Sequence, residues 1–145
     1  MNYRIYEVEE DEKEALAELR IAAMRPSLEA VGRFDPDRAR SRFLNNFCRE
    51  ATRKVEVDER LAGFYVVKDN IDHLYLDHMY IRSEFQGNGL GSLILKGIIV
   101  EAQERGLPLR LGALRGSRSN QFYQSHGFVQ THEEEWDIYY EYRKC

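Results

Sequence analysis

The chain has 145 residues, which is close to the usual size of one domain, and 43% of its residues are hydrophobic. That composition is typical of a globular protein with its own core and argues against a disordered chain. The formal net charge of −4 argues against a protein that coats nucleic acid.

The N-terminal segment and the cysteines favour a cytoplasmic protein. Residues Met1–Glu10 are polar and acidic, so they lack the basic start and the apolar run of a signal peptide. No stretch approaches the roughly 18 consecutive apolar residues of a membrane span. Cys48 and Cys145 are too few for a disulfide framework, which fits a reducing compartment. We therefore expect a single domain over residues 1–145 with no membrane or nucleic-acid partner.

The first expected elements are a short strand and a helix. Residues Tyr3–Val8 indicate the strand. Asp11 and Glu14 resemble a capping box, with aspartate in place of the usual serine or threonine, and predict a helix start. We expect this helix to stop near Arg25, because Pro26 disfavours helical geometry in the residue before it.

A second helix is predicted to begin at Asp35 and Pro36. Aspartate is a favoured N-cap, and proline is favoured at the first helical position. The apolar stripe of this helix consists of Ala39, Phe43 and Phe47.

The hydrophobic period then changes to two, which predicts three consecutive strands. Residues Lys54–Val57 alternate in polarity, and Leu61–Val67 forms a second, more apolar run after a turn at Glu59-Arg60. A third run, Ile71–Ile81, is apolar on both faces, as expected of a central strand.

A glycine-rich segment and a buried helix follow the third strand. The segment is Gln86-Gly87-Asn88-Gly89-Leu90-Gly91, and the helix is expected to run to about Arg105 and to end at Gly106 as its C-cap. The helix is apolar nearly all round, which is typical of a buried helix.

The last third of the chain predicts a strand, a short helix and a hairpin. Leu107–Leu114 is the strand, Ser117 caps a short helix to about Ser125, and Val129–Thr131 with Trp136–Tyr142 completes the chain. The expected order is β-α-α-β-β-β-α-β-α-β-β. It predicts an α/β (α+β) fold with a mixed sheet of about seven strands flanked by about four helices.

The glycine-rich segment has the properties of a pyrophosphate site. Glycine lets the backbone approach a ligand closely, and a helix start offers N–H groups and the positive end of the helix dipole. A tight structural turn is the alternative interpretation. A dinucleotide fingerprint would need a third glycine or alanine where Ser92 or Ile94 stands, and the Lys-Ser or Lys-Thr pair of a P-loop is absent.

Two motifs and the element order resemble the GNAT superfamily of N-acetyltransferases. Leu76–Ile81 running into Gln86–Ser92 is similar to the family's central strand and its Q/R-x-x-G-x-G/A loop. Asn120–Phe128 resembles the family's F-Y-x-x-x-G-F signature. The element order resembles the family's over nearly the whole chain.

The resemblance implies a site for acetyl-coenzyme A and a role for Tyr123. Met79 and Ile81 would pair through their backbone with the pantetheine arm, and the loop would hold the pyrophosphate. Tyr123 would lie near the sulfur. Many members have an asparagine where this chain has Gly116. The cofactor-binding residues expected from the resemblance are Met79, Ile81, Gln86, Gly87, Asn88, Gly89, Gly91, Ser92 and Asn120.

Acetylation of an amine needs a base and a group that stabilises the thiolate. An alkylamine with a pKa near ~10.4 is protonated at neutral pH and must lose a proton before it attacks. Asp77 and His78 are the base candidates, and a satisfied buried acid and a core histidine are their structural alternatives. Tyr123 is the candidate donor to the thiolate, with a packed tyrosine as the alternative.

The acceptor pocket is expected from the first two helices and the loop between them. Arg25 or Arg33 would hold a carboxylate or phosphate on the substrate, and Glu29 would receive a cationic amine. An ordinary polar loop is the alternative interpretation. No Cys/His cluster has the spacing of a metal site, so no metal is expected.

These residues predict an acetyl-CoA-dependent N-acetyltransferase that transfers the acetyl group directly to a primary amine. The acceptor is a small molecule or a peptide. The alternative is a non-enzymatic acyl-CoA-binding or interaction module on the same fold, since fold alone does not prove chemistry. A transferase for a longer acyl-CoA is a third interpretation. The resemblance also suggests a homodimer, because this fold often pairs through its last strands.

Overall fold

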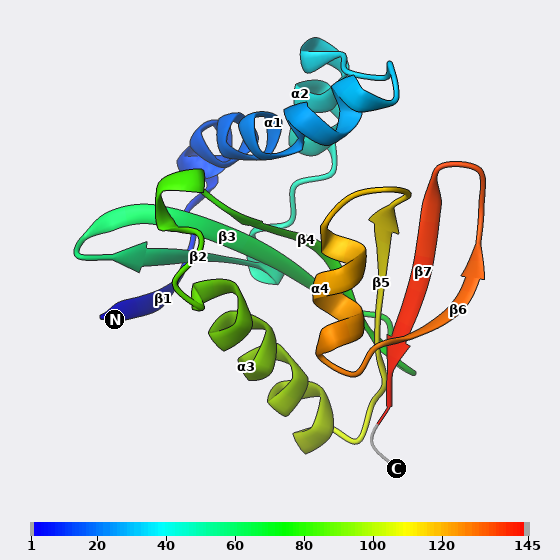
Figure 1. Ribbon diagram of the computed structural model, residues 1–145. Coiled ribbons are helices and arrows are strands. Elements are labelled where there is room, and N and C mark those ends of the chain that lie inside the picture. Colours follow the sequence, from blue (N-terminus) through cyan, green and yellow to red (C-terminus); the bar gives the residue numbers. More distant parts are fainter. Residues whose placement is uncertain (1, 144–145) are drawn as a thin grey trace. The chain divides into compact units, whose positions relative to one another are not determined.

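The computed structural model describes residues 2–143 and confirms the predicted order of strands and helices (Figure 1). Cys145 lies outside the described residues. Short 3-10 helices at Glu10–Glu12, Arg49–Ala51 and Ser83–Phe85 are additional. The elements are β1 (Tyr3–Glu7), α1 (Lys13–Ala30), α2 (Pro36–Asn45), β2 (Thr52–Val57), β3 (Arg60–Asp69), β4 (Leu74–Ile81), α3 (Leu90–Glu104), β5 (Leu109–Leu114), α4 (Ser119–Ser125), β6 (Val129–Glu133) and β7 (Asp137–Tyr142).

The strands pair in the order β1-β2-β3-β4-β5-β7-β6, which is the predicted mixed sheet. β1 and β2, β2 and β3, β5 and β7, and β6 and β7 pair antiparallel, whereas β4 and β5 pair in parallel. The chain forms two compact units. The first contains the residues up to Val66 together with His78–Asn88, and the second contains Val67–Asp77 and the chain from Gly89 on.

The predicted end of the first helix is wrong, because α1 continues through Pro26 to Ala30. The helix ends in a Schellman motif: the Gly32 N–H donates to the carbonyl of Glu29 and the Arg33 N–H donates to the carbonyl of Leu28. Gly32 has a φ of 71°, a conformation that glycine adopts at little cost. The stop signal is therefore the glycine, and the proline is tolerated inside the helix.

Replacing Pro26 with alanine should stabilise the protein. Proline inside a helix removes one N–H donor and clashes with the preceding turn, at a cost of about 3 kcal/mol. Proline also restricts the unfolded chain, which offsets about 1 kcal/mol of that cost. We expect Pro26→Ala to raise the free energy of unfolding in urea by about 1–2 kcal/mol. A decrease would mean that the proline ring makes a packing contact worth more than the lost hydrogen bond.

The predicted capping box lies two residues too far along the chain. The Glu9 N–H donates to the Glu12 carboxylate at 2.9 Å, so the box closes the short 3-10 helix that precedes α1. Glu12 also accepts a 2.7 Å hydrogen bond from Lys54 Nζ on β2. The second helix begins as predicted, since the Asp35 carboxylate accepts from the Arg38 N–H at 3.1 Å.

The core of the first unit lies between helices α1 and α2 and the strands of this unit. Figure 1 shows the two helices side by side, and Arg20 of α1 donates to the carbonyl of Ala39 on α2. The buried residues of this core are Val8, Leu16, Ala17, Leu19, Phe43, Phe64 and Val66.

Gly63 of β3 is the point of closest backbone approach in this unit. An added Cβ would lie 2.3 Å from the carbonyl oxygen of Tyr80 on β4 and 2.8 Å from Cδ1 of Ile81. Because backbone cannot yield as a side chain can, we expect Gly63→Ala to lower the free energy of unfolding by at least about 2 kcal/mol. Gly97→Ala in α3 is the control: a Cβ there meets nothing within 4 Å, and stability should rise by up to about 1 kcal/mol. Equal effects of the two substitutions would contradict the close approach.

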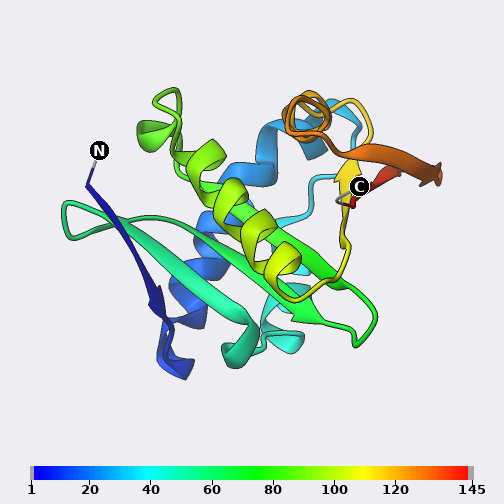
Figure 2. The same cartoon turned by 90° about the horizontal axis from the view of Figure 1, so that it is seen from below.

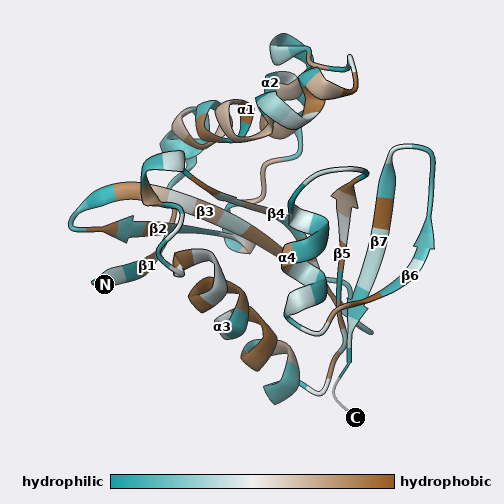
Figure 3. Ribbon diagram, in the orientation of Figure 1, coloured by the Kyte–Doolittle hydropathy of each residue, from teal (hydrophilic) through white to brown (hydrophobic). Residues whose placement is uncertain are grey.

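The second unit contains a buried helix and a short one. Leu90, Ile94, Leu95 and Ile98 of α3 are each at most 2% exposed. Leu93 and Val100 are 42% and 48% exposed, so one face of the helix is buried and the prediction of a helix buried nearly all round is wrong for the other face. Figure 2 shows α3 and the loop that leads from it into β5, and Figure 3 shows hydrophobic residues along much of α3. α4 begins at Ser119, and the Tyr140 hydroxyl on β7 donates to Asn120 in its first turn.

None of the helices within residues 2–143 is long and apolar enough to cross a membrane.

Candidate active site

The glycine-rich segment leads directly into the N-terminus of α3. Gly87 and Gly89 have φ values of 83° and 86°, a conformation that side chains rarely adopt. Gly89 is the N-cap, and the first intrahelical hydrogen bond runs from the Leu93 N–H to the Gly89 carbonyl at 3.1 Å. The N–H groups of Gly91 and Ser92 therefore have no intrahelical acceptor.

The N-terminus of α3 lacks the side chains that stabilise the start of α2. Its N-cap is a glycine with no side chain to accept a hydrogen bond, and its first turn contains no acidic residue. In contrast, α2 has Asp35 as its cap and Asp37 in its first turn. An anion is the natural partner of such an end, because it accepts from the N–H groups and interacts favourably with the helix dipole. The residues present thus fit a pyrophosphate.

Gln86 ties the start of the glycine-rich segment to the end of β4. Its Nε2 donates to the carbonyl of Ile81 at 2.8 Å, across the short 3-10 helix Ser83–Phe85. The Ile81 carbonyl therefore has an internal partner. Met79 lies two positions earlier on β4, and Asn88 lies within the loop and is exposed.

The hydroxyl of Ser92, in the first turn of α3, lies 3.0 Å from Nε2 of His126. His126 follows the last residue of α4, so this contact joins the two helices of the second unit. The pairing of Ser92 with His126 was not predicted from the sequence. A histidine at that place in the F-Y-x-x-x-G-F stretch is a signal only once the fold is known.

Tyr123 of α4 is buried, with 8% of its surface exposed. Its ring packs against Phe122 at a centroid distance of 5.4 Å and against Phe128 at 5.7 Å. These contacts fix the ring on α4, whose next residues lead to His126 and Gly127. A buried and packed ring fits both the predicted donor to the thiolate and the packed tyrosine that is its alternative.

Asn120 uses its side-chain amide inside the second unit. Nδ2 donates to the carbonyls of Leu114 and Ser117 at 2.9 and 3.0 Å, and Oδ1 accepts from the Tyr140 hydroxyl at 2.8 Å. Asn120 therefore holds the loop between β5 and α4. We assign its side chain this supporting role, and the predicted contact of Asn120 with the cofactor stays a prediction.

Asp77 lies in the middle of β4, and its carboxylate is paired with Lys68 of β3. The distance from Nζ to Oδ2 is 3.1 Å, and both side chains are about one-third exposed. Burial, together with the charges of Tyr139 and Asp77, raises the pKa of Tyr75, two residues earlier, to about 12. The hydroxyl of Tyr75 thus keeps its proton at neutral pH.

His78 lies among aromatic residues of the first unit. Its ring meets the ring of Phe43 edge-on at 5.4 Å, and Nδ1 lies 3.4 Å from the hydroxyl of Tyr80. That hydroxyl donates to Sδ of Met24 at 3.3 Å, so its oxygen is oriented to accept from Nδ1.

A family model for the acetyltransferase (GNAT) domain matches residues 24–137 of the chain. The chain belongs to the GNAT acetyltransferase family. No curated protein sequence matches the chain.

Several solved structures are similar to this GNAT family member in fold. The PaiA N-acetyltransferase of Thermoplasma acidophilum, in complex with coenzyme A, has a TM-score of 0.82 at 17% identity, with 99% of this chain and 100% of that chain covered. A protein of Pyrococcus horikoshii has a TM-score of 0.77 at 18% identity, with 99% of each chain covered. A GNAT family acetyltransferase of Elizabethkingia anophelis with acetyl-CoA bound has a TM-score of 0.69 at 17% identity, again with 99% of each chain covered. These matches show the GNAT fold.

The predicted acceptor residues of this GNAT member lie at the end of α1 and just after it. Arg25 Nε donates to the Glu29 carboxylate at 3.1 Å, one helical turn away, and the guanidinium lies 5.2 Å from the ring centroid of Phe34. Both side chains of the ion pair are at least half exposed. Arg33 follows the Schellman glycine. Arg25 and Glu29 therefore neutralise each other, which does not fit a separate anion site and cation site at these two residues.

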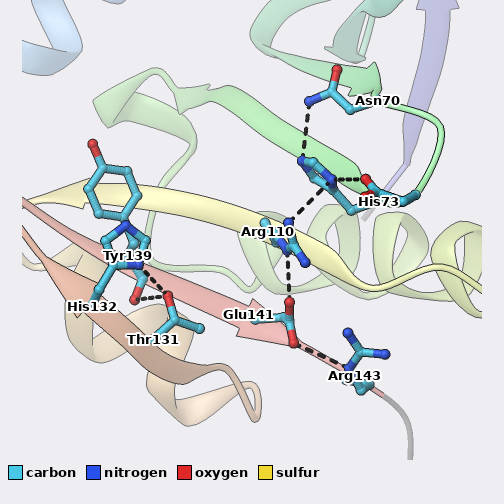
Figure 4. A network of polar contacts seen from close by, with 9 residues as sticks. Asn70, His73, Arg110, Thr131, His132, Tyr139, Glu141 and Arg143 are labelled. Carbon is cyan, nitrogen blue, oxygen red and sulfur yellow. Dashed lines mark hydrogen bonds and ion pairs between the residues drawn. The ribbon is translucent and has the colours of Figure 1, made fainter.

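A polar network of the second unit joins β5 to β7. Arg110 Nε donates to the Glu141 carboxylate at 2.8 Å, and His73 lies between Asn70 and Arg110 (Figure 4). Nδ1 of His73 also lies 2.6 Å from the carboxylate of Asp72. These groups satisfy one another, so we assign the network to the fold. Within residues 2–143, no group of three or more His, Cys, Asp or Glu side chains is placed to hold a metal ion.

Proposed function

We propose that the chain is an N-acetyltransferase that uses acetyl-CoA as its co-substrate and a primary amine as its acceptor. The observation that carries the proposal is the N-terminus of α3, where the glycine-rich loop meets a helix end with neither a side-chain cap nor an acidic residue. Membership of the GNAT family supports the acetyl transfer. Two solved structures of similar fold hold coenzyme A or acetyl-CoA, which supports the choice of ligand.

The proposed cofactor contacts are mostly made by the backbone. We propose that N–H groups around Gly87, Gly89, Gly91 and Ser92 bind the pyrophosphate, where the helix dipole adds to the hydrogen bonds. Gln86 and Asn88 belong to the same loop. Met79 and Ile81 at the end of β4 are proposed to pair with the pantetheine arm as an added strand would. The family model matches residues 24–137, so we also propose that the two units form one acetyltransferase domain.

The proposed chemistry is direct attack of the amine on the acetyl thioester. The thioester of acetyl-CoA supplies the activated acetyl group. We propose that the Tyr123 hydroxyl donates a hydrogen bond to the departing sulfur. A full proton transfer would be uphill, because a phenol has a pKa of about 10 and a thiol of about 8.5.

His78 is our first choice for the base that takes the proton of the amine. Its Nδ1 lies 3.4 Å from the Tyr80 hydroxyl, and its ring packs edge-on against Phe43. The Asp77 carboxylate is paired with Lys68, and separating the pair would cost part of its interaction energy. Asp77 is therefore the second choice.

Release of free coenzyme A in the presence of amines tests the proposal. Purified protein is incubated with acetyl-CoA and separately with a polyamine, an amino sugar, a free amino acid, a peptide N-terminus and a lysine peptide. We expect at least one amine to raise thiol release above the rate without amine, and mass spectrometry to show an acetylated product. Binding of acetyl-CoA without acetylation of any of these amines would favour the non-enzymatic module. If an amine is acylated only when a longer acyl-CoA is supplied, the donor is that acyl-CoA and not acetyl-CoA.

A further inference from the structure

His126 makes hydrogen-bonding contacts through both ring nitrogens. Nδ1 lies 2.8 Å from the carbonyl oxygen of Phe122 and 3.2 Å from Oγ of Ser125, and Nε2 lies 3.0 Å from Oγ of Ser92. The Phe122 and His126 rings also pack at a centroid distance of 4.7 Å. The ring is thus held from α4 on one side and from the first turn of α3 on the other.

The contacts of Nδ1 determine the tautomer. A carbonyl oxygen only accepts, so Nδ1 carries a hydrogen whatever the charge of the ring. The Ser125 hydroxyl donates to the same carbonyl at 2.7 Å, so its oxygen can also accept from Nδ1. In the neutral ring Nε2 is consequently an acceptor, and the hydroxyl of Ser92 donates to it.

The charge of His126 therefore decides which way the Ser92 hydroxyl points. When the ring is neutral, the Ser92 hydroxyl donates its hydrogen to Nε2, and Oγ can then offer only lone pairs to a ligand. When the ring is protonated, Nε2–H donates to Oγ and the hydroxyl hydrogen is released. An anion at the N-terminus of α3 needs donors and is repelled by lone pairs, so it favours the protonated ring.

We propose that His126 is a positioning residue of the coenzyme A site, and that it takes up a proton as the diphosphate binds and thereby turns the Ser92 hydroxyl toward the phosphate oxygens. The inference rests on the proposed function, because it needs the diphosphate at the N-terminus of α3. It adds a residue from the C-terminal end of α4 and a proton to that site. Binding of coenzyme A should then strengthen as the pH falls.

The groups that hydrogen-bond to the ring of His126 are uncharged. Its polar partners are the Ser92 hydroxyl, the Ser125 hydroxyl and the Phe122 carbonyl, none of which carries a charge. On α3 the charged residue one turn beyond Ser92 is Lys96, and Arg118 precedes α4. Lysine and arginine ordinarily carry a positive charge throughout pH 5–8, whereas histidine ordinarily changes charge in that range.

Calorimetry in buffers of different ionisation enthalpy measures the proton uptake directly. Coenzyme A is titrated into the wild type and into His126→Gln, whose amide can still bond to Ser92 but does not titrate. We expect the wild type to take up more protons than the variant. We compare the ratio of the variant's Kd to the wild-type Kd at the two pH values. This ratio should rise at least about threefold from pH 8 to pH 6. One linked proton can change it by at most about tenfold per pH unit. The phosphates of coenzyme A titrate equally in both proteins and cancel in the ratio.

Two further titrations separate the proposal from a merely structural role. Pantetheine lacks the diphosphate, so its binding should show no difference in proton uptake between the two proteins. Ser92→Ala removes the hydroxyl and leaves the histidine, so it should reduce the proton uptake on binding of coenzyme A. This variant replaces His126→Gln in the comparison if His126→Gln does not fold. If all three proteins bind coenzyme A and take up the same number of protons, the proposed role of His126 is wrong, while the proposed function is not affected. A wild type that does not bind coenzyme A would overturn the proposed function as well.

Discussion

Replacing Tyr123 with phenylalanine should lower kcat by well over tenfold and leave the Kd for acetyl-CoA nearly unchanged. The hydroxyl is proposed to act only on the departing sulfur, so its loss removes an interaction of the transition state and not of the bound cofactor. Groups that assist proton transfer or stabilise a leaving group typically contribute about 10²–10⁴-fold. The ring should keep its place, because it is buried and packs against Phe122 and Phe128.

Tyr142→Phe is the matched control. The ring of Tyr142 also packs against Phe128, at 5.5 Å, and its hydroxyl makes only a 3.4 Å contact with Gln103. Loss of that hydroxyl should change kcat by less than about twofold. Wild-type turnover in Tyr123→Phe would remove Tyr123 from the mechanism. Equal losses in the two variants would assign the effect to packing around Phe128.

Gly91→Asp should abolish most of the affinity for acetyl-CoA without destabilising the free protein. A carboxylate in the first turn of α3 interacts favourably with the helix dipole, which is worth about 0.3–1 kcal/mol to the free helix. The same carboxylate repels a diphosphate bound at that end. Like charges a few ångströms apart near a protein surface cost several kcal/mol, so we expect the Kd to rise about a hundredfold.

Gly91→Asn separates charge from size. Asparagine has nearly the shape of aspartate and no charge, so its Kd should lie well below that of the aspartate variant, and the gap should shrink at high salt. Thermal unfolding of the free proteins should show Gly91→Asp at least as stable as Gly91→Asn. If the two variants bind acetyl-CoA equally, the diphosphate does not lie at the N-terminus of α3.

Local signals were sufficient to predict most of the fold. The change of hydrophobic period after α2 marks the strands, and Asp35-Pro36 marks a helix start that the structure confirms. The prediction of a helix end near Pro26 was wrong, because a preference against helix before proline is only statistical, and Gly32 supplies the actual C-cap. The glycine-rich loop was also evident, since its residues are contiguous in the sequence.

Contacts between distant residues were not predictable from one sequence. The Lys68 partner of Asp77, the bonds of Asn120 to its loop and the Ser92–His126 contact all depend on how strands and helices pack. Composition and periodicity say which residues are buried but not which polar groups meet. The pairing of Arg25 with Glu29 was missed for another reason: the predicted helix ended near Arg25, so their spacing of four did not indicate an ion pair on one helix.

A calorimetric titration of the purified protein with acetyl-CoA, with NADH as the control ligand, tests the central claim most directly. The account predicts saturable one-to-one binding of acetyl-CoA and no binding of NADH, because the glycine-rich loop lacks the third glycine of a dinucleotide site. Absence of acetyl-CoA binding, or equal binding of both ligands, would contradict the assignment of the α3 N-terminus to the pyrophosphate of coenzyme A.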